Sequence, residues 1–409
     1  MSLRDLLTNN IDNTLSGMKW HTLKQSIVRF LLSSGDATIA ELSAELQSSI
    51  PTVTKAINEL LADGLIIDLG KITNASGRRP SLYSLAADSM YFLGIEVNRS
   101  SMSIGIQNIK NEFVSIDLSV AFVLANDFDS LKEFCQLINS FIDDSRIERE
   151  KIAGACINLS GRINSMEGFS YNYFFNENRP LTEIISEQIH LPVYLENDSR
   201  AMAFGEYSQG VVDSEQDVIF LNYSWGVGIG IITDGKLYYG KSGYSGEFGH
   251  SALFDNDKLC HCGKIGCLET EVSGWSIVEQ FEESINDGKK SLISIDKEST
   301  SLQHHTIISG AMVNEDSLCI DLVTRQSEKM GRYLSMLLNI FNPDLLIIGG
   351  DFSQLGDFVL LPVQAALRKH SLSLVNRDMK LKRSVLGRRA GVTGACQIVK
   401  QKILSPLIQ

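Results

Sequence analysis

The sequence predicts a small, mainly helical N-terminal domain followed by a larger α/β domain whose two halves have related folds. The first 85 residues contain three segments with helical spacing of apolar residues, followed by two short strands. From residue 91, strands follow one another in hairpins and then alternate with helices, as in mixed sheets covered by helices. A strand, a glycine-rich turn and a hairpin recur after residue 217, which indicates that the second half repeats the first.

The composition is that of an ordinary globular protein, with 44% hydrophobic and 21% charged residues among 409. This length favours two or three domains. The sequence has no run of about 18 apolar residues and no apolar signal-peptide core at its N-terminus, so we expect a cytoplasmic protein without membrane insertion. Four scattered cysteines are interpreted as buried free thiols of a reducing compartment: Cys135, Cys156, Cys319 and Cys396.

The charge is unevenly distributed along the chain. Residues 1–85 carry eight basic and eight acidic residues, so the net charge of −12 lies entirely on the rest. An acidic body argues against a protein that coats nucleic acid with its whole surface. A neutral N-terminal domain on such a body predicts two parts with different partners. The predicted divisions are 1–85, a first lobe of 90–203 plus 390–409, and a second lobe of 204–389.

Residues 1–85 have the element order of a winged helix-turn-helix. After a polar leader, helices are predicted at residues 21–35, 37–47 and 51–64, and strands at 65–70 and 81–85. Pro51 lies in the first turn of the third helix and Gly64 follows its last turn, positions that suit both residue types. The two strands would form a hairpin with a polar wing between them.

The third helix is the predicted recognition helix, because a short turn sets it across the second helix and lets its N-terminal residues enter a major groove. Ser48 or Ser49 is the expected cap. A Gly-Arg-Arg-Pro segment at the wing tip suits a minor groove or phosphates. The predicted DNA-binding residues are Ser49, Thr52, Thr54, Lys55, Asn58, Arg78 and Arg79. The alternative is a helical protein-interaction domain with a solvated polar face; the basic wing favours DNA.

A cysteine-rich loop marks the centre of the α/β domain. Its predicted metal ligands are His250, Cys260, Cys262 and Cys267. Three thiolates and one imidazole make a complete tetrahedral shell for structural Zn²⁺. Gly263 and Gly266 lie between the cysteines, where a tight turn needs backbone without a Cβ. Cysteines that lie close by chance are the plainer alternative, but ligand type and spacing favour zinc, which would fix a loop carrying Glu247 and Glu269.

Four segments resemble the ROK family of sugar kinases and sugar-responsive repressors. They are LENDSRA at 195–201, GYSGEFGH at 243–250, CHCGKIGCLE at 260–269 and NPDLLIIGG at 342–350. The resemblance extends over most of the chain beyond the winged helix. It implies the two-lobed, actin-like fold of the sugar kinases. The added winged helix-turn-helix is similar to the repressor branch of the family.

The resemblance also implies a sugar site. The residues that match the family's sugar ligands by position are Gly161, Arg162, Asn197, Asp198, Glu247, His250 and Glu269. Asp198 also matches the catalytic base of the kinases. Carboxylates, an amide and an imidazole suit sugar hydroxyls, which both donate and accept hydrogen bonds. If one ring nitrogen of His250 binds zinc, the other stays available to a sugar hydroxyl.

Two departures from the kinase pattern bear on catalysis. Kinases of the family have an Asp-x-Gly-Gly-Thr phosphate loop where residues 96–101 of this chain read Glu-Val-Asn-Arg-Ser-Ser. Their second phosphate loop, Gly-Thr-Gly, corresponds to Ser224-Trp225-Gly226. Side chains at these places would block the approach of backbone to phosphate. We therefore expect no enzyme activity, with Asp198 only hydrogen-bonding a sugar.

These features predict a sugar-responsive transcriptional regulator, a repressor of carbohydrate uptake or catabolism genes. The expected partners are double-stranded operator DNA, a sugar or sugar phosphate, further copies of the chain in a homodimer or homotetramer, and, as in some family members, a protein. Lobe closure on the sugar would change the spacing of paired winged helices on a two-fold operator. The alternatives are an ATP-dependent sugar kinase with an added DNA-binding domain, and a zinc-stabilised interaction protein.

Overall fold

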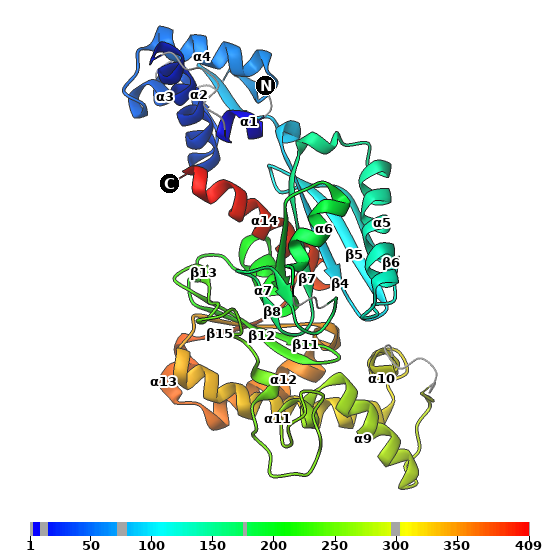
Figure 1. Ribbon diagram of the computed structural model, residues 1–409. Helices are drawn as coiled ribbons and strands as arrows, with labels where there is room; N and C mark the ends of the chain where they lie inside the picture. Colours follow the sequence, from blue (N-terminus) through cyan, green and yellow to red (C-terminus); the bar gives the residue numbers. More distant parts are fainter. Residues whose placement is uncertain (1–2, 9–14, 72–79, 175–177, 296–302, 409) are drawn as a thin grey trace.

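The computed structural model describes residues 3–8, 15–71, 80–174, 178–295 and 303–408. Figure 1 shows three parts stacked along one axis: the N-terminal domain at the top, a first α/β lobe in the middle and a second at the bottom. The C-terminal helix runs from the region between the lobes up to the N-terminal domain. The two-part organisation predicted from the sequence is therefore present, with a two-lobed α/β body.

The N-terminal domain is a winged helix-turn-helix, as predicted. Its elements are α1 (Leu3–Thr8), α2 (Leu15–Ser34), β1 (Ala37–Thr38), α3 (Ile39–Glu45), α4 (Ile50–Ala62), β2 (Ile66–Lys71) and β3 (Ser81–Leu85). Val53, Ile57 and Leu60 on the inner face of α4 are fully buried, in agreement with their helical spacing. Ser49 is the cap of α4, and its hydroxyl accepts a hydrogen bond from the backbone of Thr52.

Two details of this domain differ from the prediction. The expected two-stranded hairpin is part of a three-stranded sheet of order β1-β3-β2, because Ala37 and Thr38 at the expected start of the second helix pair with β3. The expected polar leader contains α1, whose Leu3 and Leu6 are fully buried in the core. Both elements are too short to show a periodic pattern, and both depend on contacts with distant residues.

The two lobes contain five-stranded sheets with the same strand order. The first sheet has the order β10-β7-β4-β5-β6 and the second β15-β14-β11-β12-β13. In each, the first strand along the chain lies at the centre, pairs antiparallel with the second strand and parallel with the fourth. The identical order confirms the internal repeat that the sequence indicated.

The helices and strands of the first lobe are β4 (Tyr91–Val97), β5 (Ser101–Asn108), β6 (Phe113–Ala121), α5 (Phe128–Asp144), β7 (Ile152–Leu159), β8 (Ile163–Asn164), β9 (Phe169–Ser170), α6 (Leu181–Ile189), β10 (Val193–Asn197) and α7 (Asp198–Gln209). Those of the second lobe are β11 (Val218–Tyr223), β12 (Val227–Thr233), β13 (Lys236–Leu237), α8 (Glu269–Val272), α9 (Gly274–Asn286), α10 (Gln303–Met312), α11 (Ser317–Phe341), β14 (Leu345–Gly349), α12 (Asp357–His370), α13 (Ser373–Asp378) and β15 (Lys380–Arg383). Short 3-10 turns are η1 (Ala87–Ser89), η2 (Arg149–Lys151), η3 (Phe248–His250), η4 (Asp351–Leu355) and η5 (Gly387–Arg389).

The last helix, α14 (Ala390–Ile408), joins the parts of the molecule. It packs closely on α7, where a Cβ on Gly394 would overlap the carbonyl oxygen of Ala201. A continuous group of buried side chains runs from α2 of the winged domain, including Ile27, through Phe92 of β4 to Ile398 of α14. The winged domain therefore shares its hydrophobic core with the first lobe.

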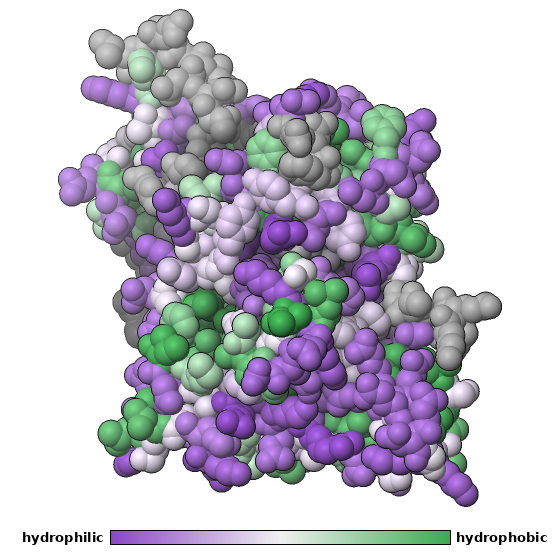
Figure 2. Space-filling model, turned by 60° about the horizontal axis from the view of Figure 1, so that its bottom comes forward, coloured by the Kyte–Doolittle hydropathy of each residue, from purple (hydrophilic) through white to green (hydrophobic). Residues whose placement is uncertain are grey.

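None of the helices in the described part of the chain combines the length and the hydrophobicity that crossing a bilayer requires. On the face drawn in Figure 2, hydrophobic residues form separate patches within a surface that is mostly hydrophilic. The four cysteines outside the cysteine-rich loop are buried free thiols, as predicted: Cys135, Cys156, Cys319 and Cys396.

Candidate functional site

A cavity of about 710 Å³ is lined by residues of both lobes. Its wall includes all the residues that the sequence matched to sugar ligands: Gly161, Arg162, Asn197, Asp198, Glu247, His250 and Glu269. These residues come from the ends of β7 and β10, the start of α7, the cysteine-rich loop and α8. The fold thus gathers segments that lie more than a hundred residues apart into one wall.

Asn197 and Asp198 lie where β10 passes into α7. The Asn197 side-chain oxygen caps the helix by accepting a hydrogen bond from the backbone of Arg200 at 3.2 Å, and its Nδ2 donates to the Gly161 carbonyl at 3.2 Å. The Asp198 Oδ1 accepts a hydrogen bond from the backbone of Ser199 at 2.7 Å. Burial raises the pKa of Asp198, against the opposing effect of these hydrogen bonds and of Arg200. The cap fixes both side chains at the cavity wall.

The two other carboxylates of the predicted sugar site are held by different means. Glu269 accepts hydrogen bonds from the backbone of Val227 at 3.1 Å and from the Trp275 indole at 3.2 Å. Each oxygen keeps a further lone pair for a ligand hydroxyl. Glu247 lies beside His250, and burial raises the pKa of Glu247 although the histidine opposes this effect.

The cysteine-rich loop brings its four predicted metal ligands together. Their ligand atoms lie within 4.8 Å of one another: His250, Cys260, Cys262 and Cys267. The Cys260 sulfur is 3.5 Å from Nδ1 of His250, and the Cys262 and Cys267 sulfurs are 3.7 Å apart. Gly263 and Gly266 have φ of 84° and 72°, the left-handed conformation expected at these turns. This donor set fits tetrahedral zinc.

The two ring nitrogens of His250 face different groups. Nδ1 points at the cysteine sulfur, whereas Nε2 lies 3.8 Å from Oε2 of Glu247 in the cavity wall. A metal on Nδ1 would place the proton on Nε2, where it can be donated to a carboxylate or to a ligand hydroxyl. The cluster and the cavity therefore share one imidazole.

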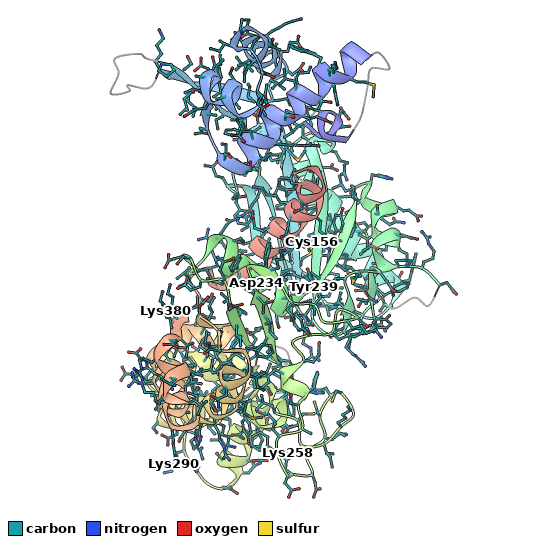
Figure 3. The ribbon with its side chains drawn as sticks, turned by 90° about the vertical axis from the view of Figure 1, so that its left-hand side faces the viewer. Cys156, Asp234, Tyr239, Lys258, Lys290 and Lys380 are labelled. Atoms are coloured by element: carbon teal, nitrogen blue, oxygen red, sulfur yellow. The ribbon has the colours of Figure 1, made fainter. Side chains whose placement is uncertain are left out.

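Arg200 is fully buried beside the site, and the sequence did not single it out although it lies in one of the quoted motifs. Its guanidinium pairs with Glu196 at 2.7 Å and donates to the carbonyl oxygens of Gly243 and Ser245 at 2.7 and 3.1 Å. It thereby ties the first lobe to the loop that carries Glu247. The Arg200 guanidinium also lies 5.5 Å from the ring centre of Tyr239. Figure 3 labels Tyr239 at the junction of the lobes.

The cavity wall also contains two acidic residues whose roles sequence reasoning missed, Glu96 and Asp351. Glu96 is 3% exposed, and burial together with the charges of Asp198 and Asp351 raises its pKa to about 8. The Arg99 guanidinium lies 5.4 Å from the ring centre of Trp225, so the two segments compared with phosphate loops meet across the cavity. Burial opposes ionisation of Asp351, but His304, His305 and Arg388 outweigh it, so the pKa of Asp351 is lowered.

The residues predicted to contact DNA lie partly on one exposed helix face. Thr52, Lys55 and Asn58 are exposed on α4, and Ser49 precedes them as its cap. Thr54 is half-buried, and its hydroxyl donates to the Ile50 carbonyl at 2.8 Å, so it is less exposed than its neighbours on this face. The Lys55 ammonium lies 4.8 Å from the Trp20 ring centre. Arg78 and Arg79 at the predicted wing tip lie outside the described residues.

Comparisons with known proteins agree with this architecture. Residues 124–402 match the ROK family, and residues 21–67 match a winged helix-turn-helix DNA-binding domain. The xylose repressor of Caldicellulosiruptor bescii is 27% identical over 94% of this chain and 98% of its own. A solved ROK family transcriptional regulator, a homologue of the E. coli Mlc protein, superposes with a TM-score of 0.75 at 25% identity, over 94% of this chain and 98% of its own.

The two-lobed part of the molecule is also similar to an enzyme. A ROK family glucokinase from Streptomyces griseus, solved with glucose and AMPPNP, superposes with a TM-score of 0.63 at 25% identity over 76% of this chain and 99% of its own. The similarity to this kinase covers 76% of the chain, whereas the similarity to the transcriptional regulator covers 94% of it. With more than half of its length matched by the family, this chain belongs to the ROK family.

Proposed function

We propose that this chain is a sugar-responsive transcriptional repressor that binds operator DNA through its winged helix and a sugar or sugar phosphate in the cavity between its lobes. The observation that carries the proposal is that one cavity brings together the residues matched to sugar ligands, among them Asn197, Asp198, Glu247, His250 and Glu269. The body that holds this cavity shares its core with a winged domain. Relatives that match this chain over 94% of its length are named xylose repressor and N-acetylglucosamine repressor. A sugar that favours one closure of the lobes would change the placement of the winged domain.

The test is binding of the purified protein to DNA from its own upstream region, with and without a panel of sugars and sugar phosphates. We expect a salt-sensitive shift that one of these ligands relieves. Asp198→Asn should still bind DNA but lose the response to the ligand. Asp321→Asn, which makes the same change on the exposed face of α11, should behave as the wild type. Equal DNA affinity with and without every ligand would contradict the sugar-responsive part of the proposal.

We also propose that the chain does not transfer phosphoryl groups. The support is the pair of segments at residues 96–101 and 224–226, where Arg99 and Trp225 present large side chains to the cavity. The similarity to a glucokinase and the presence of Asp198 favour the alternative, an ATP-dependent sugar kinase with an added DNA-binding domain. Incubation with ATP and the sugar panel decides between the two, because sugar-dependent release of ADP would establish the kinase.

We further propose that His250, Cys260, Cys262 and Cys267 bind a structural zinc ion. Zinc would hold the loop and fix the ring of His250 toward the cavity. Metal analysis of Cys262→Ala, which removes an exposed thiol, should show loss of zinc and weaker sugar binding. His261→Ala changes the residue between two of the cysteines and should retain zinc. Zinc retained by Cys262→Ala at the wild-type level would argue against this ligand set.

The remaining parts of the proposal concern assembly and location. We propose lobes of 90–203 plus 390–409 and of 204–389 behind a DNA-binding domain of 1–85, a homodimer or homotetramer in the cytoplasm, and a protein partner as a further route of control. Two-fold operators need paired winged domains, which supports an even oligomer. Light scattering of the purified protein, alone and with operator DNA, measures the oligomeric state.

A further inference from the structure

A second group of metal-type ligands lies in the same cavity, away from the thiolates. His304 and His305 follow one another in the first turn of α10, and Asp351 begins η4, which Gly350 separates from β14. All three side chains line the cavity. Their ligand atoms lie within 4.8 Å of one another. The group combines two imidazoles with one carboxylate and contains no sulfur.

The distances are those of a site that could close around an ion. Nε2 of His304 lies 2.9 Å from Oδ2 of Asp351, and Nε2 of His305 lies 3.8 Å from the same oxygen. Metal–ligand bonds of about 2.1 Å at tetrahedral angles place neighbouring ligand atoms about 3.4 Å apart. The observed separations bracket that value. Small rotations of the side chains would therefore bring the three atoms onto one ion.

The surroundings of the three side chains hold them in place and leave them accessible from the cavity. His304 is 2% exposed and packs against Trp225, with ring centres 5.5 Å apart. The backbone of Asp351 donates to the Ser224 hydroxyl at 3.0 Å, which fixes the carboxylate at the end of β14. His305 and Asp351 are 42% and 30% exposed, so an ion between them could be reached from the cavity.

We propose that His304, His305 and Asp351 bind a divalent transition metal ion, separate from the thiolate cluster and with open coordination positions that face the cavity. Two imidazoles and one carboxylate are a set that leaves such positions free, and nitrogen with oxygen ligands suits Zn²⁺, Co²⁺ and Ni²⁺. The open positions would take water or an oxygen atom of a ligand held in the cavity. This proposal stands independently of the sugar response, because it concerns only the three side chains.

The probe is Co²⁺, added to untagged full-length protein that has first received one equivalent of Zn²⁺, which the thiolate cluster binds in preference to nitrogen and oxygen ligands. Cobalt bound by nitrogen and oxygen gives weak visible bands, whereas cobalt bound by thiolates adds strong charge-transfer absorption in the near ultraviolet. We expect a further equivalent of Co²⁺ to bind with the visible bands alone. His305→Ala and Asp351→Asn should each weaken this binding about tenfold or more, in titrations followed by absorbance and calorimetry.

Matched controls show whether the three side chains bind cobalt or only form hydrogen bonds with one another. His370→Ala removes an exposed histidine from the end of α12 and should leave cobalt binding unchanged. His305 is exposed enough for its removal to leave the fold intact, which retained zinc and an unchanged circular dichroism spectrum would verify. The proposal is overturned if the zinc-filled protein takes up no Co²⁺, or if His305→Ala and Asp351→Asn bind it as well as the wild type does.

Discussion

At the scale of single residues, Arg200 decides where the ligand loop lies. Arg200 and Glu196 are each 1% exposed, and their ion pair is completed by the carbonyl oxygens of Gly243 and Ser245. Removing one partner of a buried pair leaves an uncompensated charge, which costs about 3–5 kcal/mol. We expect Arg200→Met to lower the free energy of unfolding by about that amount and to weaken sugar binding, as urea denaturation and calorimetry would measure.

An exposed pair of the same type is the control for this effect. Arg179 lies within 2.6 Å of Glu187 on the surface of the first lobe, with side chains 44% and 63% exposed. Solvent screens such a pair, so Arg179→Met should leave both the stability and the sugar affinity close to those of the wild type. Equal effects of the two substitutions would mean that burial does not set the importance of Arg200.

Glu96 predicts a pH dependence of stability. Its pKa is raised to about 8 in the folded chain from an ordinary value of 4.5. The folded state therefore holds the proton more tightly than the unfolded chain, and the resulting stabilisation is complete below the ordinary value and disappears as the pH rises through 8. Glu96→Gln cannot ionise. The unfolding temperature of the variant relative to the wild type should rise between about pH 5 and pH 8. A constant difference across this range would contradict the raised pKa.

The residues of the site differ in whether the nearby sequence is enough to predict them. His250 and the three cysteines lie within one short segment with metal-ligand spacing, so the sequence predicts their cluster. Asp198 and Glu247 could be named only because their motifs resemble those of a family. Arg200, Glu96 and Asp351 gain their roles from contacts across many residues, and no spacing in the sequence indicates such contacts.

At the scale of elements, α4 is the helix that we expect to contact the operator DNA. Asn58 and Lys55 are exposed on α4. We expect the Asn58 side chain to reach base edges and the Lys55 ammonium to contact phosphates. We expect Asn58→Ala to relax the sequence preference at one position of the operator, at a cost of about 1–3 kcal/mol. Lys55→Ala should weaken binding to all sequences alike and reduce the slope of the salt dependence by about one.

The control for α4 is a lysine of the second lobe. Lys289 is exposed after the end of α9, so Lys289→Ala makes the same charge change far from the winged domain. Titrations of operator and scrambled DNA at several salt concentrations should give wild-type values for this variant. A salt slope that Lys55→Ala leaves unchanged would exclude α4 as the phosphate-contacting element.

Elements with regular spacing were predicted well, and short ones were not. The helix α4 lies where apolar periodicity predicted a helix at residues 51–64, and after residue 91 strands come first and then alternate with helices, as the sequence predicted. The turn of the hairpin between β12 and β13 is at Asp234 and Gly235, both with positive φ, as that sequence pair predicts. The two-residue strand β1 and the helix α1 are stable only through pairing and burial against distant parts, which the local sequence does not encode.

At the scale of the whole molecule, α14 is the physical connection between the cavity and the winged domain. It begins near Glu96, since a Cβ on Gly391 would overlap the Glu96 carboxylate, and it ends in the core shared with α2. Packed cores pass on small displacements because they are close-packed and deform little. A change of lobe closure at the cavity end of α14 can therefore change the contacts that α14 makes with the winged domain at its other end.

Leu404, near the end of α14, provides the test of this connection. It is 4% exposed and belongs to the core that includes Ile27 and Leu31 of α2. Leu404→Ala should retain sugar binding and operator binding, each measured alone, because neither surface is touched. The drop in operator affinity caused by the sugar, typically ~5–150-fold for such coupling, should shrink to a few-fold.

The control is Leu361→Ala, at a 57% exposed position of α12, which should respond to the sugar like the wild type. Because the Leu404 cavity costs about 2–5 kcal/mol of stability, the titrations belong well below the unfolding temperature. A full sugar response in Leu404→Ala would assign the coupling to another path, such as a change in the arrangement of paired chains.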